Sequence, residues 1–128
     1  MQKNILLEKI TKHSDYAEMR NGYKISMPGF VLQGKPRNTE SRVKASVARY
    51  GLTCSKRIGN AVKRNRVKRR LRSLAANILP VSGLEGWDYV LIGRLNSSEN
   101  LSFRILKENL ATALTKLHNR NGERTETD

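Results

Sequence analysis

The chain has 128 residues, a length that fits a single domain, and its 25 Lys and Arg against 11 Asp and Glu give a formal net charge of +14, which predicts an anionic partner. Its one cysteine excludes an internal disulfide and a zinc cluster of several thiolates, and is typical of a reducing compartment. No segment approaches the ~20 apolar residues of a membrane span and no transit peptide is evident, so we expect a soluble, cytoplasmic protein.

The first part of the chain predicts one short helix and two strands. The helix is expected near residues 14–21, where an Asn-Gly pair ends it. Residues 30–33 follow a Pro-Gly pair and predict a strand, and residues 34–41 are expected to form a loop. Alternating apolar and polar residues then predict one long or broken strand over residues 42–55.

The next segment predicts a helix with an unusual concentration of charge. Residues 56–72 hold nine Lys and Arg and no carboxylate. Asn60, which follows a glycine, is the expected N-cap, and Pro80 is expected to end the helix. The cations are therefore expected to be fixed on a helix rather than carried by a loose tail.

Counting ~100° per residue separates the side chains of this helix into two faces. The expected core-facing stripe is apolar and consists of Val67, Leu71, Leu74, Ala75 and Ile78. The expected outward face consists of Asn65, Arg66, Arg69 and Arg72, and the flanks of the stripe of Lys63, Arg64, Lys68 and Arg70. A solvated helix usually alternates Glu with Lys, whereas the seven cations of residues 63–72 have no counter-charge between them. The pattern therefore predicts a surface that binds polyphosphate.

The last part of the chain predicts a strand and a helix. A turn at residues 83–86 precedes an apolar strand over residues 87–93, which is expected to be buried on both faces. Residues 102–117 show the spacing of an amphipathic helix. We expect one domain over residues 1–118 and a disordered polar tail over residues 119–128. The expected order is helix, strand, strand, helix, strand, helix, in a small α/β sandwich.

Catalytic motifs are scarce in this sequence. It contains neither a Gly-x-Ser-x-Gly nucleophile elbow nor a P-loop, and its carboxylates are not clustered. His13 and His118 are interpreted as ordinary histidines on helix surfaces rather than metal ligands, and Asp88 as a residue that begins a strand rather than a base. If the chain belongs to an enzyme, its own side chains are not expected to be the catalyst.

Residues 51–72 resemble the signature of the protein subunit of bacterial ribonuclease P, whose Arg-Asn-Arg core stands here as Arg64-Asn65-Arg66. Residues 14–16, 28–33, 88–94 and 110–117 resemble that family in the same order, so the resemblance covers about residues 5–118. It implies a small two-layer α+β sandwich with a central, mostly antiparallel sheet, similar to the second domain of ribosomal protein S5. It also implies a left-handed βαβ crossover that contains the basic helix, against the usual right-handed rule.

The resemblance implies a function in an endoribonuclease holoenzyme whose catalyst is RNA. In that family Mg²⁺, bound mainly by the RNA subunit and the substrate, supports removal of the 5′ leader from precursor tRNA. This chain would bind the catalytic RNA and the leader. The implied RNA contacts are Lys56, Arg57, Asn60, Lys63, Arg64, Asn65, Arg66, Lys68, Arg69 and Arg72. The implied lining of the leader cleft is Tyr16, Phe30, Leu32 and Arg94.

The cleft of this chain offers fewer aromatic residues than is common in the family, so leader affinity is expected to depend more on charge than on stacking. The alternative reading is a ribosomal or general structured-RNA-binding protein, which would bind RNA without supporting leader cleavage. A DNA-binding helix protein would have a second short helix and a turn before the basic helix, and this chain lacks both. A membrane-surface helix would carry large aromatics on its apolar face.

Overall fold

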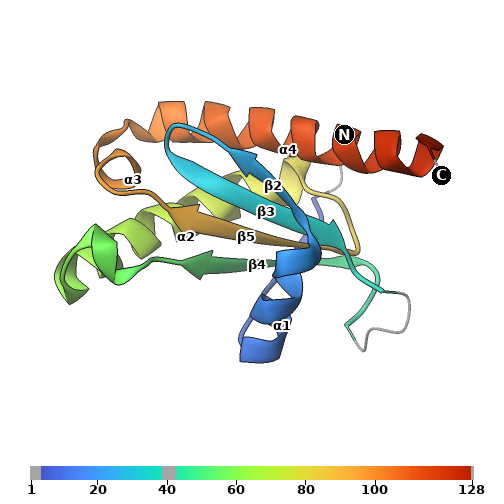
Figure 1. Ribbon diagram of the computed structural model, residues 1–128, viewed down its shortest axis with the longest axis horizontal. Helices are drawn as coiled ribbons and strands as arrows, with labels where there is room; N and C mark the ends of the chain where they lie inside the picture. The colour runs from blue at the N-terminus through green and yellow to red at the C-terminus, as the bar shows by residue number, and fades with distance from the viewer. Residues whose placement is uncertain (1–3, 39–42, 128) are drawn as a thin grey trace.

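One mixed sheet organises the chain in the computed structural model, which describes residues 4–38 and 43–127, the last six by their backbone alone (Figure 1). In that part of the chain the strand order is β1-β4-β5-β3-β2. The strands are β1 (Leu6–Lys9), β2 (Tyr23–Ser26), β3 (Phe30–Pro36), β4 (Val47–Thr53) and β5 (Trp87–Gly93). The helices are α1 (His13–Glu18), α2 (Ala61–Ser82), α3 (Ser97–Asn100) and α4 (Phe103–Thr127), with short 3-10 turns η1 (Met19–Asn21) and η2 (Lys56–Ile58).

The sheet combines antiparallel and parallel pairings. β3 pairs antiparallel with β2 and with β5, and β4 pairs parallel with β1 and with β5. The antiparallel pairings join slightly more residues than the parallel ones. In Figure 1 both β4 and β5 point to the left and α2 passes behind the sheet, so the step from β4 to the strand above it is left-handed. The mixed α+β fold expected from the resemblance is confirmed.

The main core lies between the sheet and the two long helices, α2 and α4. Successive strand residues point to opposite faces, so Tyr89 and Leu91 of β5 join the core of α2 and α4, whereas Val90 faces the other side. There Val90 packs with Ile10 and Met19, close to α1. Among the described residues, one face of the sheet is therefore covered by α2 and α4, and the other carries α1 and the neighbouring turn η1.

Several elements differ from the sequence expectations. β1, β2 and α3 were not predicted, and the strand expected over residues 42–55 is confined to Val47–Thr53 within the described residues. Pro80 does not end α2, which continues to Ser82, where the Gly83 amide closes it by donating to the Leu79 carbonyl at 2.8 Å. α4 extends through residues 119–127, where the sequence predicted a disordered tail. This polar segment contains Glu and Arg, which are good helix formers.

His118 is not the surface histidine that the sequence suggested. Its ring packs edge-on against Trp87, with 5.0 Å between ring centroids, and its Nε2 lies 2.8 Å from the Tyr89 hydroxyl. Burial lowers the pKa of His118 and raises that of Tyr89. The pair therefore joins α4 to β5.

Among the described residues, no helix is long and apolar enough to cross a membrane.

Candidate nucleic-acid interface

The basic helix begins at a glycine turn that fixes its direction. Gly59 has φ +141°, a backbone conformation that L side chains rarely adopt, and a Cβ there would lie 2.8 Å from Cδ of Lys63. The Oδ1 atom of Asn60 accepts a hydrogen bond from the Lys63 amide at 3.0 Å. Asn60 is therefore the N-cap, as predicted, and its side-chain oxygen is engaged in that role.

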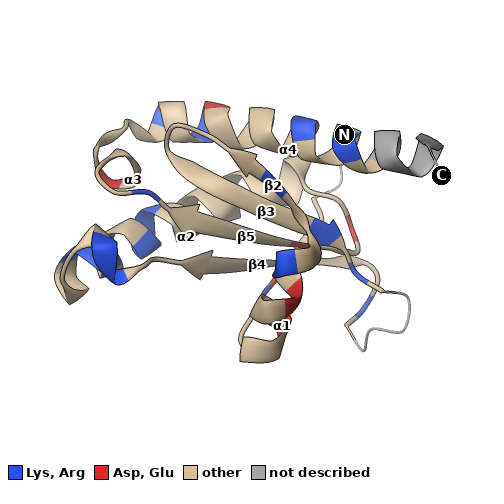
Figure 2. Ribbon diagram, in the orientation of Figure 1, with Lys and Arg blue, Asp and Glu red and all other residues tan. Residues whose placement is uncertain are grey.

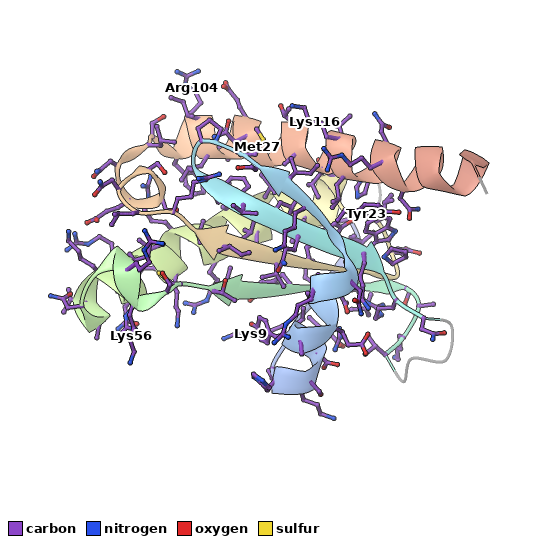
Figure 3. The ribbon with its side chains drawn as sticks, in the orientation of Figure 1. Lys9, Tyr23, Met27, Lys56, Arg104 and Lys116 are labelled. Atoms are coloured by element: carbon purple, nitrogen blue, oxygen red, sulfur yellow. The ribbon has the colours of Figure 1, made fainter. Side chains whose placement is uncertain are left out.

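The two predicted faces of α2 are present in the structure. Val67, Leu71, Leu74 and Ala75 are buried and Ile78 is half-buried. The residues predicted to contact RNA are exposed or half-buried: Lys56, Arg57, Asn60, Lys63, Asn65, Arg66, Arg69 and Arg72 are exposed, and Arg64 and Lys68 are half-buried. Figure 2 shows the Lys and Arg of α2 gathered toward the end of the helix near α3, and in Figure 3 Lys56 points away from the body of the protein. We call this outward set the basic face.

Arg70 and Arg66 are engaged by α3. The Arg70 guanidinium donates to the Ser98 carbonyl at 2.8 Å and also to the carbonyls of Glu99 and Leu101. The Arg66 Nη1 atom donates to the Glu99 carboxylate at 2.6 Å. Arg70 therefore ties α2 to α3, while Arg66 remains on the basic face with 55% of its side chain exposed.

A first hollow, of about 310 Å³, lies where α1, β4 and α2 meet. Its lining is Lys9, Ile10, Thr11, Tyr16, Leu52, Lys68 and Arg72. It thus brings Tyr16, predicted to lie in the leader cleft, together with Lys68 and Arg72, two cations predicted to contact RNA. The neighbouring thiol of Cys54 has its pKa raised by burial, which the positive charges of Lys68 and Arg64 partly oppose.

Tyr16 reaches this hollow with its hydroxyl already bonded to the protein. The hydroxyl donates to the Ile10 carbonyl and accepts from the Leu52 amide, each at 3.3 Å. Its ring lies so close to β4 that a Cβ on Gly51 would be 2.6 Å from the ring's Cε1. The ring of Tyr16, rather than its hydroxyl, is therefore the part that is available to a ligand.

A second hollow, of about 730 Å³, lies just beyond the end of β4. Its lining is Ser26, Met27, Pro28, Val31, Ser55, Arg57, Ile58, Gly93, Arg94, Leu95 and Ser97. It joins Arg94 to Arg57, and Nη2 of Arg94 donates to the hydroxyl of Ser26. The buried Nε atom of Arg94 has no hydrogen-bond partner among the described residues. This hollow is therefore a second place where cations surround open space.

Phe30 and Leu32 do not line either hollow, which corrects the sequence expectation. Both side chains are 0% exposed and belong to the core that α2 and α4 cover. Strand alternation places their neighbour Val31 on the opposite face, in the second hollow. Of the four predicted cleft residues, the structure therefore places Tyr16 and Arg94 at hollows, one at each.

An ion-pair network holds α1 beside the sheet. The Asp88 carboxylate, 5% exposed, accepts from Nε and Nη2 of Arg49 at 2.9 and 2.7 Å and from Nη1 of Arg37 at 2.8 Å. The Arg49 Nη1 atom also contacts Asp15 of α1 at 3.1 Å. The hydrogen bond to Asp88 raises the pKa of Arg49. Asp88 is thus a structural anchor that ties Arg37 and Arg49 to β5.

The described residues contain no group of His, Cys, Asp and Glu able to hold a metal ion. Sequence reasoning missed Glu99, Arg37 and Arg49, because each acts through a partner more than 30 residues away in the chain. The excess of Arg in the sequence was a signal of charge but not of these pairings. The arrangement as a whole offers a cationic helix with two hollows near the end of the neighbouring strand.

Comparison with known proteins gives one consistent result. A model of the family described as ribonuclease P matches residues 6–118. The chain is similar to the ribonuclease P protein component of Ruegeria pomeroyi, with 41% identity over 85% of each chain, and to that of Erythrobacter litoralis, with 40% identity over 89% of this chain and 88% of the relative. Its fold is similar to that of the RNase P protein from Staphylococcus aureus (TM-score 0.63, 25% identity, 84% of this chain and 92% of the other). The fold of the Thermotoga maritima RNase P protein is also similar (TM-score 0.65, 22% identity, 85% and 96%).

Proposed function

The chain belongs to the ribonuclease P protein family and is the protein subunit of that endoribonuclease, and from this membership we propose how it binds RNA. The catalytic RNA is a separate subunit of the holoenzyme, and this chain associates with it. In our proposal the basic face contacts that RNA, and the two hollows hold the 5′ leader of precursor tRNA. The outcome is Mg²⁺-dependent cleavage that gives the mature 5′ end.

The observation that carries this proposal is the exposure of the cations on one rigid helix. Arg69 and Arg72 lie on the exposed side of α2, one turn apart, opposite the buried Val67 and Leu71. Phosphate contacts from a fixed set of cations position a protein on a folded RNA, because the spacing of the charges has to match the spacing of the phosphates. A helix held by its own core supplies such a fixed set.

The hollows suit a single-stranded leader of variable sequence. Leu52 lines the first hollow and Ser55 the second, so they lie three residues, or ~10 Å, apart along the chain. A short strand of RNA can cross such a distance, with its phosphates near Arg72 at one end and Arg94 at the other. Contacts to the backbone and to base faces do not read sequence.

Charge supplies most of the leader affinity in this proposal. Phe30 and Leu32 are in the core, and the hydroxyl of Tyr16 is bonded to the protein, so one aromatic ring remains as a stacking surface among the four predicted cleft residues. Lys68 and Arg72 lie in the same hollow as that ring. We therefore expect phosphate contacts to contribute more than stacking does.

Mg²⁺ is bound mainly by the RNA subunit and the substrate in this proposal. The described residues do not fit a Mg²⁺ site, which needs oxygen ligands such as carboxylates, because they offer no carboxylate cluster and the basic face is cationic. The proposal also places the protein in the cytoplasm, with precursor tRNA as its substrate partner and without a membrane or an obligate protein partner. Its own residues bind and orient RNA.

Reconstitution with a ribonuclease P RNA tests the proposal. At low Mg²⁺, the wild-type chain is expected to permit cleavage of precursor tRNA at a rate well above that of the RNA alone. Arg69→Ala is expected to weaken binding of the catalytic RNA ~10-fold, since a charge-assisted contact contributes roughly 1.5 kcal/mol. Binding by filter retention and cleavage by gel electrophoresis measure the two effects.

Lys116→Ala is the matched control, because it also removes one exposed cation but from the outer side of α4 (Figure 3). It is expected to leave affinity and cleavage close to those of the wild type. A chain that binds RNA but does not promote precursor cleavage would overturn the proposal and favour a general structured-RNA-binding protein.

A further inference from the structure

The basic face receives a carboxylate from a distant part of the chain. The Oε1 atom of Glu99 lies 2.6 Å from Nη1 of Arg66, the second arginine of the Arg-Asn-Arg core. The side chain of Glu99 is 17% exposed, whereas that of Arg66 is 55% exposed. The helix α2 has no carboxylate of its own, so the fold brings one counter-charge to the basic face from α3. This carboxylate is more buried than the arginine that it contacts.

Glu99 is held in place by contacts that do not involve its own side chain. The hydroxyl of Ser98, which is fully buried, donates to the Gly29 carbonyl at 2.6 Å and accepts from the Arg94 amide at 2.7 Å. On the other side, Arg70 donates to the backbone carbonyls of Ser98, Glu99 and Leu101. The backbone of α3 is therefore held on both sides, and the Glu99 side chain extends from a fixed position.

The contact with Glu99 uses one edge of the Arg66 guanidinium. Arginine presents five N–H donors in a planar fork, and the contact with Glu99 engages Nη1. More than half of the side chain stays exposed, so the remaining donors can face a phosphate while Nη1 is held. An arginine that is already oriented loses less rotamer freedom when it binds than a mobile one does.

The same carboxylate lowers the attraction of the basic face for any polyanion. Non-specific binding of nucleic acid depends on the number of cations that neutralise phosphates and is largely independent of their orientation. Specific binding depends in addition on the geometry of each contact. Glu99 therefore affects the two kinds of binding in opposite directions.

We propose that Glu99 is a positioning residue that makes the basic face selective. It holds Arg66 in the orientation that meets the ribonuclease P RNA, and it reduces the attraction for other RNA. This inference rests on the proposed function, since it takes the catalytic RNA as the specific ligand.

Two substitutions at this position separate orientation from charge. Glu99→Ala removes both the charge and the hydrogen bond, whereas Glu99→Gln removes the charge but keeps an oxygen that accepts from Arg66. The dissociation constants are measured for a ribonuclease P RNA and for an unrelated structured RNA of equal length, at one salt concentration. Thermal unfolding of each variant checks that it is folded.

Glu99→Ala is expected to weaken binding of the ribonuclease P RNA by roughly 3- to 10-fold, the loss that follows from one mobile arginine, and to strengthen binding of the unrelated RNA by about 2-fold. Glu99→Gln is expected to bind the ribonuclease P RNA as tightly as the wild type does. It is expected to bind the unrelated RNA more tightly than the wild type does, because the negative charge is absent. In an Arg66→Ala background, Glu99→Ala is expected to cause no loss of affinity for the ribonuclease P RNA, because the coupling between the two residues is then absent. Only the effect of the removed charge remains, which strengthens the binding of both RNAs by about 2-fold.

Glu108→Ala is the charge-matched control. Glu108 pairs with Arg104 within α4, both side chains are more than 60% exposed, and neither belongs to the basic face. It removes the same charge and is expected to leave the ratio of the two affinities unchanged.

A Glu99→Ala variant with the wild-type ratio of affinities would overturn the inference, as would one that binds both RNAs more tightly. Either result, with a selective wild type, leaves the proposed function standing. A wild-type chain that binds both RNAs equally would overturn the inference and the proposed function together.

Discussion

Phe30 and Val31 are neighbours in β3 whose side chains serve different purposes. Phe30 is fully buried in the core that α2 and α4 cover, and Val31 is half-buried in the second hollow, beside Arg57 and Arg94. Their chemistry is similar, so hydrophobicity alone does not assign them. What differs is the face of the sheet on which each side chain lies.

Phe30→Ala is expected to lower the free energy of unfolding by ~3–5 kcal/mol, because it leaves a cavity among packed side chains. Val31→Ala is expected to cost much less, since Val31 is only half-buried and faces the hollow. Urea denaturation of both variants measures the difference. A Phe30→Ala variant with wild-type stability and weakened leader binding would show that Phe30 faces the ligand after all.

The sequence predicts the two faces of α2 well, because a period of 3.6 residues places Val67, Leu71 and the other apolar residues on one side of the helix. It also predicts that Phe30 and Leu32 share a face. It does not tell which face of the sheet α2 and α4 cover, since that depends on the handedness of the crossover and on the packing of α4. The cleft assignment of Phe30 and Leu32 was wrong for this reason.

At the scale of elements, α1 is held to the sheet by ion pairs more than by buried apolar surface. It has six residues and no buried side chain, so it contributes little apolar surface to the core. Its Asp15 contacts Arg49, which the buried Asp88 holds, and its Glu18 contacts Lys35 at 2.8 Å on the surface. These two attachments differ in burial and therefore in energy.

Asp88→Ala is expected to lower the free energy of unfolding by about 3–5 kcal/mol, because it leaves the buried guanidinium groups of Arg37 and Arg49 without their carboxylate. Glu18→Ala removes a surface pair and is expected to cost much less, because solvent screens that pair. The urea midpoints of the two variants give the comparison. Equal and small losses would contradict the view that Asp88 anchors the network.

The elements that the sequence predicts are those with strong local signals. β5 is a run of apolar residues between glycines, and α2 has an N-cap and a clear period. β1, β2 and α3 have four residues each and gain their structure from neighbours: β1 from parallel pairing with β4, β2 from β3, and α3 from Arg70 and Ser98. Such short elements carry too little pattern to be distinguished from loops.

At the scale of the whole molecule, charge is distributed unevenly. The net charge of +14 includes arginines that are bonded within the protein, such as Arg37, Arg49 and Arg70, and others that remain on the basic face. The internally bonded arginines do not release counterions from RNA when it binds. The salt dependence of binding therefore reports the exposed cations rather than the net charge.

Simultaneous Lys68→Ala and Arg72→Ala, at the two cations that line the first hollow beside Tyr16, is expected to reduce the slope of log affinity against log salt by ~1.4–1.8, at roughly 0.7–0.9 for each phosphate that is no longer neutralised. Lys116→Ala is expected to leave the slope unchanged. Titrations of leader-bearing precursor tRNA at several salt concentrations measure it. A shallow wild-type slope, with binding that depends on Tyr16 instead, would contradict a charge-led interface.

The contact between α2 and α3 also matters during synthesis, because its two sides are made at different times. The ribosome makes the chain from the N-terminus, so all nine cations of residues 56–72 leave it before Glu99 and before the three carbonyls that Arg70 binds. The helix α4, which completes the core under α2, follows later still. During synthesis there is accordingly an interval in which the nascent chain is strongly basic, Arg66 lacks its partner Glu99, and the core is unfinished. In that interval its cations attract RNA without regard to its identity, the RNA of the ribosome included. The selectivity that we propose for Glu99 can act only once residue 101 and α4 have emerged.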